Sequence, residues 1–206
     1  MPGSVHIDLF SSLDGVMQAP GRVDEDPSGG FPFGGWQARF EDDVVGERVI
    51  AGIRAMDALL LGRRTYEIFA GYWPRISGAG PAGEIARLFN ALPKYVASRG
   101  DRPLGWNNSH LLGLDLGREI VALRGRHTEV HVVGSIDLAR TLLAERWFDV
   151  LNLWVYPVVL GAGKRLFPET SARHDLALLE PPRSGSAGAV SLRYGPADVD
   201  ASACQA

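Results

Sequence analysis

The sequence predicts an α/β fold, with a mostly parallel central sheet and an antiparallel hairpin near the C-terminus. Three observations indicate it: apolar runs of strand length alternate with stretches of helical periodicity, a Gly-, Pro- and Ser-rich turn joins the last two runs, and 206 residues suffice for one substantial core. Because no composition shift or repeat divides the chain, we expect a single domain over residues 1–195 and a frayed, polar tail at 196–206.

The N-terminal quarter predicts a strand, a long loop and a helix. VHIDLFSSL, residues 5–13, alternates apolar and polar side chains and ends at the turn pair Asp14-Gly15. Residues 17–35 are rich in Gly, Pro and acidic residues, which indicates either a loop that closes over a binding site or a solvated insertion. Residues 41–56 carry apolar side chains at helical spacing.

The middle of the chain predicts two further strands, each next to a helix. The expected elements are a buried strand at 58–62, a helix at 65–73 capped by Thr65 and stopped by Pro74, a helix at 84–92, a strand at 94–99, and a strand or turn followed by a helix within 111–125.

The last third predicts one more strand–helix–strand unit and then the hairpin. The expected elements are a strand at 129–134, a helix at 135–145 with Ser135 or Asp137 near its cap, a strand at 151–156 broken by Pro157, and hairpin strands at 176–180 and 189–194.

Composition argues against several classes of protein. A net charge of −3 gives no overall positive field, which disfavours a nucleic-acid partner. The single cysteine, Cys204, cannot form an internal disulfide framework or a multi-cysteine zinc site. The N-terminus lacks the pattern of a signal peptide, and no apolar run approaches the roughly 20 residues that span a bilayer. We therefore expect a cytoplasmic protein that is not bound to a membrane.

Two strand-to-helix turns are candidate phosphate sites. In LLLGRRTYE, Gly62 allows a tight turn, and free amides at the helix start would lie beside Arg63, Arg64 and Thr65. The same strand, turn and helix recur at Gly134-Ser135. One such turn could hold a single phosphate, and two at neighbouring strand ends could hold a dinucleotide.

A third strand end favours a phosphorylated dinucleotide. The strand at 94–99 ends in Ser98-Arg99, a hydroxyl and a guanidinium that would suit a 2′-phosphate and so select NADP over NAD. The alternative is that these arginines are solvated surface charges, which is the commoner fate of a single arginine.

Acidic and aromatic residues near these turns are candidates for catalysis and substrate binding. Asp14 ends the first strand, where open α/β sheets place ligands. An acidic triplet opens the first helix, where carboxylates also serve simply as partners of the helix dipole. The candidate acids are Asp14, Glu41, Asp42 and Asp43, and the candidate aromatic slot consists of Trp36, Phe40, Tyr66, Phe69 and Tyr156.

The sequence predicts no metal site. HTEVH, residues 127–131, has the spacing of a helical zinc motif but lies in a predicted strand. Four residues of strand separate His127 and His131 by roughly 13 Å, too far to share one zinc ion, so we expect a structural role for His131.

Five segments together resemble the dihydrofolate reductase-like superfamily, and most closely the C-terminal reductase domain of the bifunctional riboflavin-biosynthesis deaminase/reductase. These segments are SSLDG, GRRTYE, PKYVASR, VHVVGSIDLARTLL and DVLNLWVYPVVLGAGKRLF. The resemblance covers about residues 4–195, and no deaminase half accompanies it. It implies a three-layer fold and hydride transfer from NADPH to a pterin- or pyrimidine-like heterocycle, and it suggests a homodimer. A non-catalytic NADP(H)-binding or regulatory module on the same fold is the alternative.

The resemblance also implies roles for individual residues. Leu13, Gly15 and Val16 would line the nicotinamide, Gly62, Arg63, Arg64 and Thr65 would hold cofactor phosphates, Ser98 and Arg99 would face the 2′-phosphate, and Val133, Gly134, Ser135, Ile136, Asp137 and Leu138 would grip the diphosphate. One departure stands out, since authentic dihydrofolate reductases have consecutive glycines where this chain has Gly134-Ser135.

Overall fold

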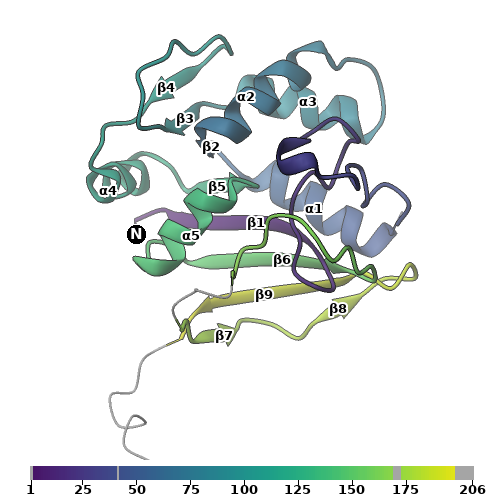
Figure 1. The fold of residues 1–206 in the computed structure, drawn as a ribbon. Coiled ribbons are helices and arrows are strands. Elements are labelled where there is room, and N and C mark those ends of the chain that lie inside the picture. Colours follow the sequence, from purple (N-terminus) through teal and green to yellow (C-terminus); the bar gives the residue numbers. More distant parts are fainter. Residues whose placement is uncertain (1, 41, 169–172, 198–206) are drawn as a thin grey trace, which may run out of the picture.

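The computed structural model describes residues 2–40, 42–168 and 173–197, and its strands join into one twisted sheet (Figure 1). The strand order is β4-β3-β2-β5-β1-β6-β9-β7, with β8 also paired to β9. The strands are β1 (Ser4–Ser12), β2 (Ala58–Gly62), β3 (Lys94–Ala97), β4 (Ser109–Leu111), β5 (Glu129–Val133), β6 (Val150–Tyr156), β7 (Leu176–Leu178), β8 (Arg183–Ser184) and β9 (Val190–Pro196).

The strand directions confirm the predicted sheet. β1 pairs in parallel with β5 and β6, β2 pairs in parallel with β3 and β5, and β4 continues the parallel half. β9 runs antiparallel to β6, β7 and β8, which completes the C-terminal hairpin. Because β5 enters between β2 and β1, the turns after β2 and β5 emerge side by side at one edge of the sheet.

Helices cover both faces of the sheet, as the three-layer prediction requires. In Figure 1, α4 and α5 lie in front of the sheet and α1 lies behind it. The helices are α1 (Asp43–Ala55), α2 (Arg63–Tyr72), α3 (Pro81–Ala91), α4 (Leu116–Arg126) and α5 (Ile136–Ala144), with short 3-10 turns at Ser28–Gly30 and Trp73–Arg75. No helix in the described ranges is both long and apolar enough to cross a membrane.

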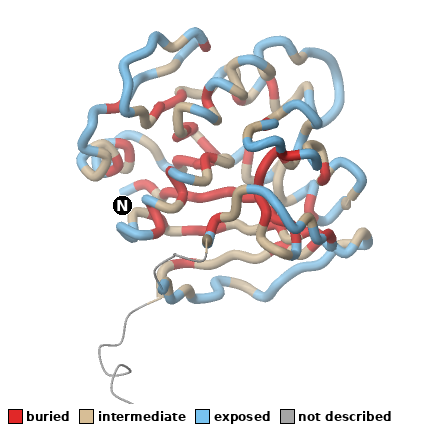
Figure 2. Tube along the Cα trace, in the orientation of Figure 1, coloured by how far each residue is buried: buried red, intermediate tan, exposed pale blue. Residues whose placement is uncertain are grey.

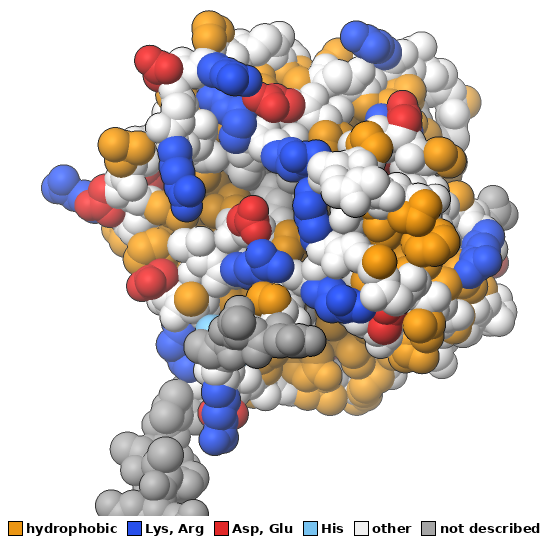
Figure 3. Space-filling view, viewed as in Figure 1, with side chains coloured by type: hydrophobic (Ala, Val, Ile, Leu, Met, Phe, Trp, Pro, Cys, Tyr) orange, Lys and Arg blue, Asp and Glu red, His pale blue; other side chains and the backbone are white. Residues whose placement is uncertain are grey.

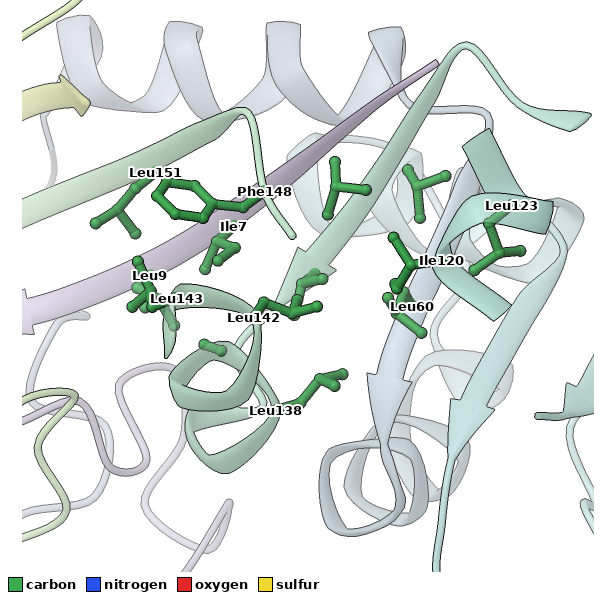
Figure 4. Close-up of a cluster of buried hydrophobic side chains, with 14 of the residues drawn as sticks. Ile7, Leu9, Leu60, Ile120, Leu123, Leu138, Leu142, Leu143, Phe148 and Leu151 are labelled. Atoms are coloured by element: carbon green, nitrogen blue, oxygen red, sulfur yellow. The ribbon is translucent and has the colours of Figure 1, made fainter. Parts of the chain in front are cut away.

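The larger core fills the space between the sheet and the α4–α5 layer. Alternate residues of β1, Val5, Ile7 and Leu9, face this side and are essentially inaccessible to solvent. They meet leucines and isoleucines of α4 and α5 (Figure 4), and the central strands are the most continuously buried part of the chain (Figure 2). This packing holds the ends of the central strands in fixed positions.

The opposite face of the sheet is divided into two apolar clusters with polar side chains between them. One cluster joins α1, α2 and α3 to β2 and β3, and the other surrounds Trp154 and Tyr156 of β6. Between them, His6, Asp8 and His131 lie buried under α1.

Two predicted helix starts were wrong. α2 begins at Arg63 with Gly62 as its N-cap, so Thr65 lies within the first turn and does not cap the helix. α3 begins at Pro81, three residues before the expected start at residue 84, because proline at the first helical position already has a helical φ. The end of the predicted tail, together with Cys204, lies outside the described residues.

Candidate functional site

The turns after β2 and β5 are joined directly. The amide of Gly62 donates a 2.9 Å hydrogen bond to the hydroxyl of Ser135. Gly134 has a φ of +66°, and a Cβ there would stand 3.6 Å from the methyl of Thr65. The two predicted phosphate sites therefore form one continuous surface at the carboxyl edge of the sheet.

Two helix N-termini open onto this surface. α2 and α5 both begin at the joined turns, and no acidic residue occupies the first turn of α2. Free backbone amides and the positive ends of two helix dipoles favour negatively charged groups here. Ser135 adopts a left-handed conformation with a φ of +58° and makes no side-chain cap to α5, because its hydroxyl is used by Gly62.

Two arginines and a serine lie together where the chain leaves β3, next to the surface formed by the joined turns. Arg63 donates through Nε to the hydroxyl of Ser98 at 3.2 Å and through Nη2 to the carbonyl of Arg102 at 2.9 Å. The exposed side chain of Arg99 lines the same part of the cleft. Arg63 at the start of α2 thus lies beside Ser98 and Arg99, which follow β3.

Arg64 points the other way, toward the long loop between β1 and α1. Its Nη2 meets Asp26 Oδ1 at 2.5 Å, and Lys164 Nζ meets the other oxygen of that carboxylate at 2.6 Å. Burial of Asp26 raises its pKa, but hydrogen bonds from Lys164, Ser28 and Arg64 outweigh this and lower the pKa to about 2. The loop is therefore fastened over the cleft by an ionised carboxylate between two cations.

All these groups face one large cleft of about 1950 Å³. Single small-molecule sites usually span roughly 300–1,000 Å³, so this volume accommodates a dinucleotide together with a second ligand. Figure 3 shows the hollow in this face with Lys and Arg side chains around it. The predicted residues that line it are Asp42, Asp43, Gly62, Arg63, Arg64, Thr65, Ser98, Arg99, Val133, Gly134, Ser135, Ile136, Asp137, Leu138, Phe40, Phe69 and Tyr156.

Hydrogen-bond donors line the apolar end of the cleft. Tyr156 accepts a 2.8 Å bond from the side-chain amide of Gln37, which leaves its own O–H free to donate. Burial, offset by Gln37 and reinforced by the charge of Asp42, raises the pKa of Tyr156 to about 12. Trp154, which is stacked on Phe10 at 5.0 Å, has a buried Nε1 with no hydrogen-bond partner among the described residues.

The turn after β1 does not face the cleft as predicted. Leu13 is two-thirds exposed, Val16 is fully buried, and neither they nor Gly15 are among the lining residues. The following segment, Met17 to Arg22, lines the cleft instead. The prediction assumed that the chain turns toward the cleft directly after Asp14-Gly15. Instead, Val16 forms an antiparallel bridge with Arg165, and the chain reaches the cleft only after it.

Asp14 has a structural role. Burial raises its pKa, but bonds from the Ser12 hydroxyl and the amides of Leu160 and Gly161 together outweigh burial and hold the pKa of this carboxyl well below its usual range. Arg165 also contacts it at 3.2 Å. Asp14 does not line the cleft and both of its oxygens are engaged, so the expectation that it acts as the acid is wrong.

The acidic triplet divides into separate roles. Asp42 caps α1 through Val45 and accepts from the amide of Ala187, so both of its oxygens are engaged. Asp43 is exposed on the first turn of α1 and lines the cleft. Glu41 lies outside the described residues.

Two of the predicted aromatic residues belong to the core. Trp36 is buried, donates through Nε1 to the carbonyl of Gln18, and packs edge-on behind Tyr156. Tyr66 is buried, and its hydroxyl accepts from the amide of Trp106. Helical and strand periodicity cannot distinguish a residue that faces a cleft from one that faces the core beneath it.

Sequence reasoning missed Asp26 and Lys164, which are 138 residues apart along the chain. The acidic content of the loop and the lysine in GAGKRLF were visible signals, but the loop has no pattern that fixes its path. The sequence-based prediction also gave no role to Gln37, which contacts Tyr156 across 119 residues of the chain.

Comparison with known proteins bears out the resemblance seen in the sequence. The family described as the RibD C-terminal domain matches residues 4–186. An uncharacterized protein from Bacillus subtilis (strain 168), YyaP, is 26% identical over 193 residues, covering 91% of this chain and 92% of its own.

Solved structures share the fold at low identity. A pyrimidine reductase-like protein from Corynebacterium diphtheriae superposes with a TM-score of 0.61 at 16% identity, covering 96% of this chain and 92% of that one. Dihydrofolate reductase from Enterococcus faecalis, in complex with NADP(H), has a TM-score of 0.54 at 14% identity, covering 96% and 99%.

Proposed function

The chain belongs to the RibD C-terminal domain family, and on that basis we propose that it is an NADPH-dependent reductase of a pterin- or pyrimidine-like heterocycle. The observation that carries the proposal is the joining of Gly62 to Ser135, which makes one anion-binding surface from two helix starts. The dihydrofolate reductase from Enterococcus faecalis, which shares this fold, was solved in complex with NADP(H), and this supports NADPH as the proposed cofactor.

The residues of the cleft fit a phosphorylated dinucleotide. The amides at the starts of α2 and α5 would hold the diphosphate, and Arg63, with Ser98 and Arg99 beside it, would hold the 2′-phosphate. Gly62 and Gly134 keep the surface free of side chains where a ligand must approach closely. When bound, NADPH supplies the hydride that reduces a C=N or C=O bond.

The apolar end of the cleft suits a flat heterocycle that carries acceptors. The free O–H of Tyr156 and the unpartnered Nε1 of Trp154 are donors in a buried setting, where an unmet donor is costly. Ring nitrogens or carbonyl oxygens would satisfy both, and Phe10 and Phe40 supply apolar surface. We assign Tyr156 to orientation and polarisation of the substrate.

Among the candidate acids that the structure describes, Asp43 is the best placed to hold a water beside the substrate. It lines the cleft and, within the described part of the chain, makes no side-chain hydrogen bond. Its exposure places it beside solvent, so a water held by Asp43 could deliver the proton that follows the hydride.

Turnover tests the proposal. Purified protein with NADPH should oxidise the cofactor when offered one member of a panel of pterins, ribosylaminopyrimidines and quinonoid carbonyls, followed by the loss of NADPH absorbance. An Asp43→Asn variant should lose turnover and retain NADPH binding. Binding without turnover across the whole panel would favour a non-catalytic NADP(H)-binding module instead. A homodimer is also proposed, and sedimentation of the same preparation tests it.

A further inference from the structure

A cluster of potential metal ligands lies at the opposite end of the strands from the joined turns. His6 on β1 stands directly across from His131 on β5, and Ser4 stands across from Glu129. Side chains of these residues share the face of the sheet under α1. His6 and His131 are buried, their ring centroids are 4.6 Å apart, and about a third of the Glu129 side chain is exposed.

Three donor atoms converge in this cluster. Glu129 Oε2 is 3.4 Å from His131 Nε2 and 4.0 Å from His6 Nδ1, and one ligand atom from each residue lies within 4.8 Å of the others. These separations exceed the 2.7–3.2 Å of good hydrogen bonds. The 3.4 Å separation matches the roughly 3.3 Å between ligand atoms around a tetrahedral zinc ion with bonds of about 2.0–2.1 Å, and the wider separations would have to shorten when an ion binds.

Neighbouring acceptors direct the lone pairs of both histidines toward the centre. His131 donates through Nδ1 to Asp8 Oδ2 at 2.6 Å, which leaves Nε2 as the free nitrogen. The Ser4 hydroxyl donates to the carbonyl of Thr128, so Ser4 Oγ accepts from His6 Nε2 at 2.9 Å, and Nδ1 of His6 is left free. Fixing the second ring nitrogen in this way is typical of metal-bound histidines.

The carboxylate that orients His131 is itself held in place by a neighbouring side chain. Asp8 is itself held by the side-chain amide of Asn152 through Oδ1 at 2.8 Å. Within the described ranges, the carboxylate of Glu129 contacts the two histidines and forms no ion pair with a lysine or arginine. A divalent cation would balance the charges of Glu129 and Asp8, and the partial exposure of Glu129 provides a path of entry.

We propose that His6, Glu129 and His131 form a binding site for a divalent first-row transition ion of the zinc class, with water as a fourth ligand. Two imidazoles and one carboxylate suit such an ion better than calcium or magnesium, which prefer all-oxygen ligands. The ion would link β1 to β5 beneath α1. His131 and Asp8 also line the cleft, whereas His6 and Glu129 do not, so the proposed ion would lie beside the cleft. The inference rests on these ligand atoms and does not require the proposed reductase function.

Metal titration tests the site. Tag-free, chelator-treated full-length protein is titrated with Co²⁺, followed by visible absorption, and with Zn²⁺, followed by calorimetry. We expect one equivalent of Co²⁺ to give a saturable band that Zn²⁺ displaces, and Zn²⁺ to raise the Tm. Glu129→Gln and His6→Gln should abolish the band. The Asp8→Asn variant should weaken Zn²⁺ binding about 10- to 100-fold, because Asp8 acts through His131.

A matched control distinguishes this site from nonspecific metal binding by surface histidines. His110→Gln removes an exposed histidine on β4 and should leave the Co²⁺ band and the Zn²⁺ affinity unchanged. Circular dichroism and the Tm in chelator show whether each variant is folded, and Glu129→Gln is the mildest substitution because its side chain is partly exposed. No saturable band in the wild type, or an equal band in Glu129→Gln and His6→Gln, would overturn the proposal.

Discussion

Gly62 at the end of β2 and Ser135 at the start of α5 are joined by a 2.9 Å hydrogen bond from the Gly62 amide to the Ser135 hydroxyl. This bond aligns the N-termini of α2 and α5. The Ser135 hydroxyl does not cap its own helix, because it links to the neighbouring turn. Because of this link, different substitutions of Ser135 should lower the free energy of unfolding by different amounts.

Substitution of Ser135 should destabilise the protein in a defined order. Ser135→Ala leaves the Gly62 N–H without its acceptor, which costs about 1–3 kcal/mol. Ser135→Gly loses the same bond but relieves the left-handed φ of +58°, worth roughly 1 kcal/mol, so its free energy of unfolding should lie between wild type and Ser135→Ala. Denaturant unfolding measures both. Ser109→Ala on β4 is the control, and equal stability of Ser109→Ala and Ser135→Ala would contradict the assigned role.

Arg63 should discriminate between the two nicotinamide dinucleotides. Loss of its guanidinium in Arg63→Ala removes a charge-assisted contact beside Ser98, so the Kd for NADPH should rise about 10- to 100-fold. The Kd for NADH should change by no more than about twofold. Arg118→Ala, an exposed residue on α4, should alter neither. Equal losses for both cofactors in Arg63→Ala would show that Arg63 does not face the 2′-phosphate.

Tyr156 should affect turnover more than cofactor binding. Tyr156→Phe keeps the ring and removes the free O–H, so kcat/KM should fall about 10- to 100-fold while the Kd for NADPH stays within about twofold. Because the pKa of Tyr156 is raised to about 12, the hydroxyl stays protonated and the loss should be constant from about pH 6 to 9. Tyr194→Phe on β9 is the matched control. A loss confined to NADPH binding would place Tyr156 in the cofactor site instead.

Asp26 should make stability depend on acid pH. Its pKa in the folded protein is about 2, below the ordinary 3.8, so its ionised form stabilises the fold above about pH 4. That contribution is lost as the pH falls from about 4 to about 2. Asp26→Asn should therefore lower the free energy of unfolding by about 1–2 kcal/mol at pH 7, and the gap from wild type should close below about pH 3.

Asp24→Asn controls for the general effect of removing charge from this loop. Asp24 is more than four-fifths exposed and pairs with Arg22 alone among the described residues, so the free energy of unfolding of Asp24→Asn should match that of wild type at every pH. A pH-independent gap between wild type and Asp26→Asn would contradict the assigned ion pairs with Arg64 and Lys164.

Local sequence patterns predicted the order of strands and helices because each pattern has a local cause. Alternation places Val5, Ile7 and Leu9 on one face of β1, and Gly62 permits the turn into α2. The two candidate phosphate sites followed from the same logic, since parallel strands deliver successive helix starts to one edge of the sheet. The joining of the two helix starts at one end of the cleft could therefore be predicted from sequence.

The features that sequence did not predict depend on register and on loop paths. Whether Tyr66 faces the cleft or Trp106 is a matter of helix rotation, which apolar spacing leaves open. The meeting of Asp26 with Lys164 depends on how a 19-residue loop folds over the cleft, from residue 17 to 35. The approach of His6 to Glu129 depends on the pairing of β1 with β5, which alternation alone does not fix.

An equilibrium titration that follows NADPH fluorescence shows whether the joined turns bind NADPH. We expect saturable binding with a Kd in the micromolar range or below, and binding of NADH at least about tenfold weaker, because NADH lacks the phosphate that Arg63 would hold. No saturable change with NADPH up to high micromolar concentrations, measured on protein shown to be folded, would contradict the account.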